Sequence, residues 1–233
     1  MIPGKAAEWL RDPHVQIYLW DLIRWCALPN YWVARWRWTG RTCPGGLKLH
    51  LGSGDRYVEG WVNIDGKPFL VRKDLWLDLR TGLPFADETV SVIYSSHTFE
   101  HFFMPELQAL LRECRRVLVR GGVMRVCMPS LERMIAAYVA GDHGFFDGAA
   151  CRVAGVYLRR SLGGKFAEML LHHGAHKLAF DFGFLTELME EAGFVGISEH
   201  KFRESAALEA SDLIRLEGED IIEHSLFVEG ARP

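Results

Sequence analysis

The stretch from Leu47 to Asp65 constrains the fold more than any other part of the chain. Residues 47–51 alternate leucine with lysine and histidine, which is the period of a β-strand. This predicted strand stops at Gly52-Ser53-Gly54, where glycines lack the β-carbons that would keep a ligand away from the backbone. A second short apolar run follows and ends in Asp65. We therefore expect a strand, a glycine turn and a second strand that closes on an acidic residue.

This arrangement suits the binding of a nucleotide. An acidic residue at the end of the second strand can accept hydrogen bonds from both hydroxyls of a ribose, so Asp65 is the candidate for that contact. Most glycine turns only reverse the chain, however, and a glycine turn alone is weak evidence. The segments that follow decide between these interpretations.

Composition limits the classes of protein to consider. With 233 residues and 49% hydrophobic composition, the chain can form one α/β domain with a sizeable core, with or without an appendage. A formal net charge of −3 gives no electrostatic reason to expect a nucleic-acid partner. The five cysteines are scattered without a C-x-x-C pair, which indicates free thiols and a reducing compartment. Without a secretory signal or a run of ~20 apolar residues, we expect a soluble, cytoplasmic protein.

Residues 1–43 differ from the rest because they contain six of the eight tryptophans. Apolar residues at helical spacing predict a helix over 15–28, which Pro29-Asn30 ends. We favour packing of these aromatics over the core or the substrate cleft, because large apolar side chains are usually buried. An interface between two copies of the chain and docking on a membrane surface stay open as alternatives.

Two polar sites follow predicted strands in the middle of the chain. Asp78 comes after a short strand and could hold an adenine amino group, although an Asp at the start of a Gly-Pro turn is common. A buried strand over 90–94 ends at Ser95-Ser96-His97. Side chains at the carboxyl end of a parallel strand lie where open α/β sheets bind ligands. His97 is therefore a candidate general base.

The remainder of the chain predicts an alternation of helices and strands. Gly121-Gly122 should cap the first of these helices, and a less regular segment at about 130–180 should form a cap-like insertion over the site. The last two strands should pair antiparallel. We expect helices over 105–118, 130–140 and 181–192, and strands over 123–128, 194–202 and 225–228.

A cluster of histidines raises the question of a metal. His172, His173 and His176 have spacings that could place two ligands together on a helix. No acidic residue or cysteine stands out beside them as the obvious partner that the usual ligand set needs. The sequence alone therefore predicts no metal site.

Taken together, six motifs resemble those of class I S-adenosylmethionine-dependent methyltransferases, in that family's order. The likeness is greatest to the small bacterial predicted methyltransferases that accompany polysaccharide and secondary-metabolite genes, and it covers about residues 47–233. The motifs are Leu-Gly-Ser-Gly54, Asn-Ile-Asp65, Asp-Leu-Arg-Thr-Gly-Leu-Pro-Phe85, Ser-Ser-His-Thr-Phe-Glu-His101, Arg-Arg-Val-Leu-Val-Arg-Gly-Gly122 and the closing Ser-Leu-Phe-Val-Glu-Gly-Ala-Arg-Pro233.

The resemblance implies a Rossmann-like α/β three-layer sandwich with a seven-stranded, mostly parallel sheet whose last strand is antiparallel. It divides the chain into a tryptophan-rich helical extension over 1–43 and a methyltransferase domain over 44–233. S-adenosylmethionine would be the cofactor. The residues that it implies for cofactor binding are Gly52, Ser53, Gly54, Asp65, Asp78, Leu79 and Ser95.

The same resemblance places His97, Glu100 and His101 at the methyl group or the acceptor. His97 would be the general base, His101 its alternative, and Glu100 would orient a histidine or bind substrate. We expect methyl transfer to a hydroxyl of a small molecule or glycan. An inactive cofactor-binding partner protein and a nicotinamide-dependent oxidoreductase are the rival hypotheses, and the missing third glycine weakens the second.

Overall fold

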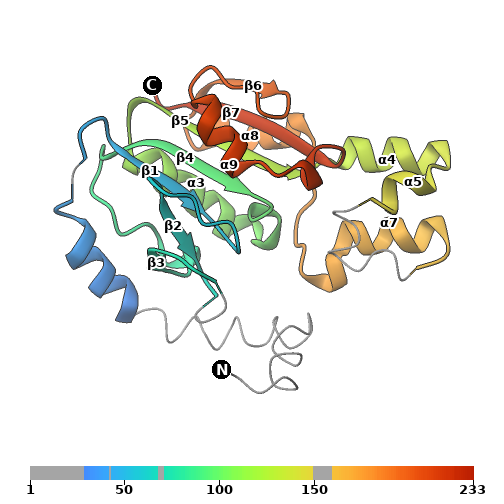
Figure 1. The fold of residues 1–233 in the computed structure, drawn as a ribbon, viewed down its shortest axis with the longest axis horizontal. Helices are drawn as coiled ribbons and strands as arrows, with labels where there is room; N and C mark the ends of the chain where they lie inside the picture. Colours follow the sequence, from blue (N-terminus) through green and yellow to red (C-terminus); the bar gives the residue numbers. More distant parts are fainter. Residues whose placement is uncertain (1–28, 42, 68–70, 149–158) are drawn as a thin grey trace.

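A computed structural model describes residues 29–41, 43–67, 71–148 and 159–233. In this part of the chain one seven-stranded sheet runs through the molecule, with strand order β3-β2-β1-β4-β5-β7-β6 (Figure 1). Neighbouring strands are parallel except at β7, which is antiparallel to both β5 and β6. The strands are β1 (Leu47–Leu51), β2 (Val62–Asp65), β3 (Leu75–Trp76), β4 (Val90–Ser96), β5 (Leu118–Pro129), β6 (Val195–His200) and β7 (Ser225–Ala231).

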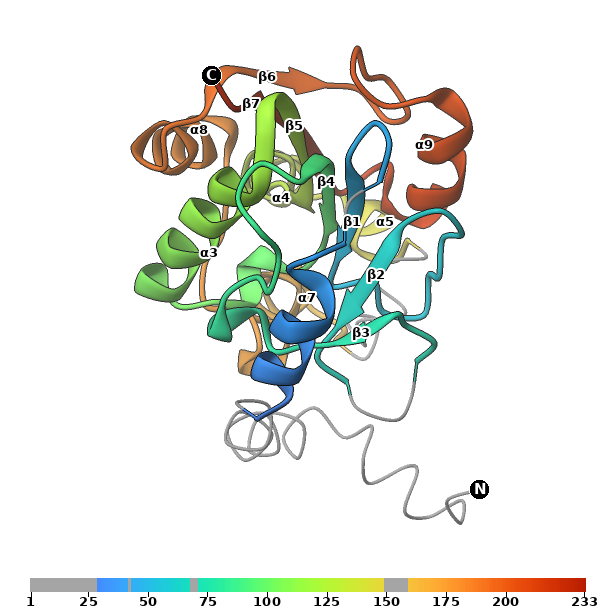
Figure 2. The same ribbon diagram turned by 90° about the vertical axis from the view of Figure 1, so that its left-hand side faces the viewer.

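Helices cover both faces of this sheet. Helices α3 (Met104–Val117) and α8 (Phe182–Glu191) lie on one face and α9 (Ala210–Leu216) on the other (Figure 2). The main core fills the layer under α3 and α8, and a second apolar cluster joins Leu213 and Leu216 of α9 to Tyr94 of β4. The predicted α/β three-layer sandwich with an antiparallel last strand is confirmed.

The start of β5 differs from the prediction. Gly121 and Gly122 do not cap the preceding helix, because α3 ends at Val117 and the strand begins directly at Leu118. Gly121 adopts a φ of 73° within the strand and donates its N–H to the carbonyl of Arg232 over 2.8 Å. The two glycines thus bend the strand where it meets the end of β7.

A second group of helices lies beside the sheet, between β5 and α8 in the sequence (Figure 1). Helix α4 (Leu131–Ala140) starts as predicted at Ser130, whose hydroxyl accepts a hydrogen bond from the N–H of Arg133. With α5 (His143–Phe146) and α7 (Leu162–Leu171) it encloses a separate apolar cluster. This group corresponds to the predicted insertion; its role as a cap stays a prediction.

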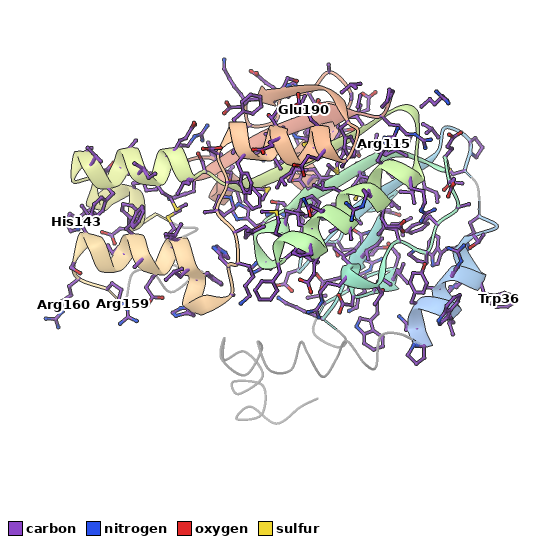
Figure 3. The ribbon with its side chains drawn as sticks, turned by 180° about the vertical axis from the view of Figure 1, so that it is seen from behind. Trp36, Arg115, His143, Arg159, Arg160 and Glu190 are labelled. Atoms are coloured by element: carbon purple, nitrogen blue, oxygen red, sulfur yellow. The ribbon has the colours of Figure 1, made fainter. Side chains whose placement is uncertain are left out.

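Part of the tryptophan-rich segment belongs to the main core. Residues 29–38 form a helix in which Ala34 and Trp38 are buried, and the Trp38 ring meets Phe85 edge-on at 5.6 Å. On the other side of this helix, Trp36 is 86% exposed (Figure 3). The predicted helix over 15–28 lies outside the described residues. No described helix is long and apolar enough to cross a bilayer.

A fully buried arginine connects strands β5 and β7 with the segment between β6 and β7. The Arg125 side chain of β5 has 0% exposure; its Nε donates to Glu217 over 2.6 Å and its Nη1 donates to Glu229 over 2.8 Å. Its guanidinium also donates to the backbone carbonyls of Lys201 and Glu204. This network joins β5 and β7 to the long connection between β6 and β7.

Replacing Arg125 should be costly, because it leaves two buried carboxylates without their partner. We expect Arg125→Met to lower the free energy of unfolding by about 3–5 kcal/mol. Arg159→Met is the matched control, because Arg159 forms an exposed ion pair with Glu168 and should contribute only about 0–1 kcal/mol. Urea denaturation of both variants measures the difference, and equal losses would contradict this account of Arg125.

Acid should also weaken the fold through His50, which is buried in β1 and lies 3.3 Å from the amide oxygen of Asn63. Burial lowers the pKa of His50 from 6.5 to about 4, because the charged imidazole loses its hydration, and the charge of Arg56 adds to this effect. The folded state therefore resists protonation, and the stability held above pH 6.5 is lost as the pH falls toward 4.

The glutamine variant separates this contribution from other acid effects. Between pH 6.5 and 4, His50→Gln should lose less unfolding free energy than the wild type, by up to about 3 kcal/mol. His143→Gln, at an exposed position, should leave the acid loss unchanged. Chemical denaturation at a series of pH values tests this, and parallel curves for wild type and His50→Gln would refute it.

Candidate functional site

The carboxyl ends of three neighbouring parallel strands bring the predicted cofactor residues together. Leu51, the last residue of β1, lies opposite Ile64 of β2 and Ser95 of β4. The chain leaves β1 toward β2 on one side, while β4 pairs with it on the other, so the strand order reverses between β1 and β4. Open α/β sheets bind ligands at such a switch point. The glycine turn, Asp65 and Ser95 all lie at this edge.

Both glycines of the turn have backbone conformations that favour glycine. Gly52 and Gly54 have φ values of 67° and 52°, in the left-handed region. A β-carbon on Gly52 would collide with the side chain of Thr98, whereas one on Gly54 would meet no atom within 4 Å. Gly52 thus lets the loop after β4 approach closely, and Gly54 borders open space.

Ser53 and Asp65 have polar atoms suited to a ligand at this turn. The Ser53 hydroxyl is buried and has no hydrogen-bond partner among the described residues, which marks a place for a bound group. The Asp65 carboxylate accepts hydrogen bonds from the N–H of Gly54 over 2.9 Å and of Lys67 over 2.7 Å. Because a carboxylate has about four acceptor positions, two stay available for a ribose diol.

The other three predicted cofactor positions already make contacts within the protein. Asp78 caps the short helix η1 (Leu79–Thr81), and both of its carboxylate oxygens accept hydrogen bonds from Arg80. The Leu79 side chain is buried in the core. Ser95 donates its hydroxyl to the carbonyl of Leu51 over 3.1 Å. An adenine contact by Asp78 would therefore share the carboxylate with Arg80.

His97 follows β4 in a strained conformation. Its φ of 47° is unusual for a residue with a side chain, and its N–H donates to the carbonyl of Cys127 over 2.9 Å. Its ring lies between two polar groups: Nε2 is 2.8 Å from the Ser225 hydroxyl and Nδ1 is 3.6 Å from a Glu100 carboxylate oxygen. Strain of this kind concentrates at functional sites.

Glu100, in the short helix η2 (Phe99–His101), is the most unusual acidic residue of the site. It is 1% exposed, and neither carboxylate oxygen has a hydrogen-bond partner in the part of the chain that the structure describes. Burial raises its pKa from 4.5 to about 8, because the charged form loses hydration and the residue's own backbone N–H offsets this loss only in part.

Three histidines gather beside Glu100. The rings of His101 and His176 are 5.0 Å apart, and His172 stacks on His176 at the same distance. Nε2 of His176 is 3.9 Å from Glu100. Loss of hydration lowers the pKa of His101 to about 4 and that of His176 to about 3, even though His101 keeps exposed surface.

The sequence did not place His176 at this site. It lies 76 residues beyond Glu100, in the connection from α7 to α8. The N–H groups of Lys177 and Leu178 donate to the Glu100 carbonyl and hold this connection against η2. The three closely spaced histidines were the only signal, and the acidic partner that the metal hypothesis lacked is Glu100.

Comparison with known proteins indicates the class of chemistry of this site. Residues 74–126 match the family model of a methyltransferase domain, and the matched segment contains Asp78, Ser95, His97, Glu100 and His101. This match supports the predicted class of enzyme, an S-adenosylmethionine-dependent methyltransferase. S-adenosylmethionine, the predicted cofactor, is consistent with this domain. The sequence matches none of the curated proteins with which it was compared.

Among solved structures, the methyltransferase is similar to several proteins at low identity. A chain from the complex of the Haloferax volcanii Trm112 methyltransferase activator with a methyltransferase is 16% identical, with a TM-score of 0.48 over 97% of this chain and 96% of that one. A SAM-dependent methyltransferase from Thermotoga maritima is 16% identical, with a TM-score of 0.47 over 96% and 98%. Phosphoethanolamine N-methyltransferase 2 from Haemonchus contortus is 13% identical, with a TM-score of 0.49 over 97% and 59%. Similarity at this level does not identify an acceptor.

The cofactor pocket can be tested at Asp65. Asp65→Ala should weaken S-adenosylmethionine binding by about 2–4 kcal/mol, because two hydrogen bonds between a charged carboxylate and the ribose are lost. Asp65→Asn should fall between this variant and the wild type. Isothermal titration measures the affinities, with Asp55→Ala, an exposed residue of the same turn, as the control. Wild-type affinity in Asp65→Ala would mean that the pocket lies elsewhere.

Proposed function

We propose that this methyltransferase transfers a methyl group to a hydroxyl of a small molecule or glycan. The observation that carries the proposal is the position of His97 at the carboxyl end of β4, next to the cofactor edge and against the buried carboxyl of Glu100. An oxygen nucleophile must lose a proton during transfer, and a histidine at this place is suited to accept it.

Different residues would bind different parts of the cofactor. The glycine turn and Ser95 would contact the methionine part, Asp65 the ribose, and Asp78 with Leu79 the adenine. The unpartnered hydroxyl of Ser53 fits this assignment. When bound, S-adenosylmethionine supplies a methyl group already activated by its positively charged sulfur, so that positioning of the acceptor provides most of the remaining acceleration.

His97 takes the proton of the acceptor hydroxyl as the acceptor oxygen forms its bond to the methyl carbon. Glu100 acts through His97 as a positioning residue, because its carboxylate oxygen lies 3.6 Å from Nδ1 of the ring. Ser225, 2.8 Å from Nε2, fixes the other side of the ring. His101 is the alternative base, although its lowered pKa makes it the weaker one.

Three further features are part of the proposal. The insertion that contains α4, α5 and α7 forms a cap over the acceptor, and the hydrogen bonds from Lys177 and Leu178 to Glu100 support its attachment to the site. The resemblance favours an enzyme of the group associated with polysaccharide and secondary-metabolite genes, and the scattered cysteines favour the cytoplasm. The exposed Trp32 and Trp36 supply a surface for a second copy or for the acceptor.

Replacing His97 tests the base directly. His97→Ala should lower turnover by at least about 100-fold and leave the affinity for S-adenosylmethionine nearly unchanged, because the ring acts on the acceptor and not on the cofactor. His143→Ala, at the far end of the insertion (Figure 3), is the control. Turnover is measured with saturating acceptor, found by an intact-mass search for methylated products. Turnover within about threefold of wild type would exclude His97 and direct attention to His101.

A further inference from the structure

The burial of the Glu100 carboxyl group is electrostatically unfavourable in this fold. A carboxyl group that is 1% exposed normally has hydrogen-bond donors, yet neither of its oxygens is paired among the described residues. Nitrogens of His97 and His176 lie 3.6 and 3.9 Å from one of its carboxylate oxygens. A buried carboxyl group without hydrogen-bond donors requires an explanation, and the binding of an ion is one of the usual ones.

The neighbouring histidines are held in the manner of metal ligands. Nδ1 of His101 lies 3.3 Å from the carbonyl of Ala175, and Nδ1 of His176 lies 3.1 Å from the carbonyl of Leu170. Because a carbonyl only accepts hydrogen bonds, each Nδ1 carries the hydrogen, and each Nε2 of the neutral rings keeps its lone pair. Backbone carbonyls orient ligating histidines in the same way at many metal sites.

We propose that Glu100, His101 and His176 bind a divalent transition-metal ion, with zinc as the favoured ion. One ligand atom from each of the three residues lies within 4.8 Å of the other two. In a tetrahedral zinc site the ligand atoms are about 3.4 Å apart, so closure requires shifts of roughly 1 Å. Side chains from η2 and from the connection after α7 can make such shifts without moving the sheet.

The donor set determines the class of metal. Two imidazoles and one carboxylate suit zinc and other late divalent transition metals, whereas magnesium and calcium prefer oxygen ligands alone. Three protein ligands leave a fourth position open, which is typical of catalytic zinc sites. Metal binds the neutral imidazole, and the carbonyls that face Nδ1 of His101 and His176 leave each Nε2 with its lone pair.

The role of the ion, unlike the site itself, rests on the proposed function. At the open position the ion would bind the acceptor oxygen and lower the pKa of its hydroxyl group, while His97 takes the proton. His101 is then a ligand and not the alternative base.

Metal binding can be measured without any methyl acceptor. Chelator-treated protein is titrated with cobalt(II), whose visible absorption reports coordination, and the cobalt is then displaced with zinc. We expect one ion per chain. His176→Gln and Glu100→Gln should each weaken binding by at least about 100-fold, because a ligand is lost. Thermal unfolding of each variant verifies the fold; Glu100→Gln resembles the protonated carboxyl and should fold.

His173→Asn is the matched control, because His173 lies within the same histidine cluster but pairs with Glu168 over 2.9 Å. It should bind cobalt within about threefold of wild type. The proposal is overturned if the wild type binds no stoichiometric metal, or if His176→Gln and Glu100→Gln bind as the wild type does. A protein that binds zinc at this site but transfers no methyl group would refute the proposed function and leave the metal site standing.

Discussion

The parallel pairing of β1 with β4 at the centre of the sheet is the constraint on which the site depends. Leu51 and Ser95 lie opposite each other there, and the Ser95 hydroxyl donates to the Leu51 carbonyl, so the carboxyl ends of both strands are fixed in register. The chain continues from these ends in opposite directions across the sheet, which separates the loops and leaves the switch point between them. A shift of register would turn each of these side chains to the other face.

Arg125 and Glu100 are both buried ionisable residues, but their surroundings differ. Arg125 has two carboxylates and two carbonyls as partners, so its charge is compensated within the protein and its role is structural. Glu100 is equally buried but has no hydrogen-bond donor among the described residues. Burying an ionisable group without a partner costs free energy. Proteins keep such groups where a ligand or a reaction supplies the missing partner. This contrast, and not burial itself, separates the candidate site from the core.

The sequence could predict the parts of the site that depend on local order along the chain. The glycine turn, Asp65 and His97 each follow a recognisable strand, and the ends of parallel strands necessarily meet at one edge, so their proximity followed from topology. The contacts of His176 with Glu100 and of Arg125 with Glu217 join segments 76 and 92 residues apart. No periodicity specifies such pairs. The predicted start of β5 was wrong for a related reason, because the N–H of Gly121 donates to the carbonyl of the distant Arg232.

His97 precedes η2 and His101 lies within it. Their spacing in the sequence alone did not separate their roles. His97 is strained, partly exposed and placed between a hydroxyl and a carboxyl, an arrangement that suits a group exchanging protons with an acceptor. His101 packs against His172 and His176, and its Nδ1 faces the carbonyl of Ala175, so that its Nε2 keeps the lone pair that a ligand needs. Their shared neighbour is Glu100, which can orient the first and coordinate metal together with the second. A division of labour between base and ligand therefore accounts for both histidines, whereas two competing bases would leave the third histidine, His176, without a function.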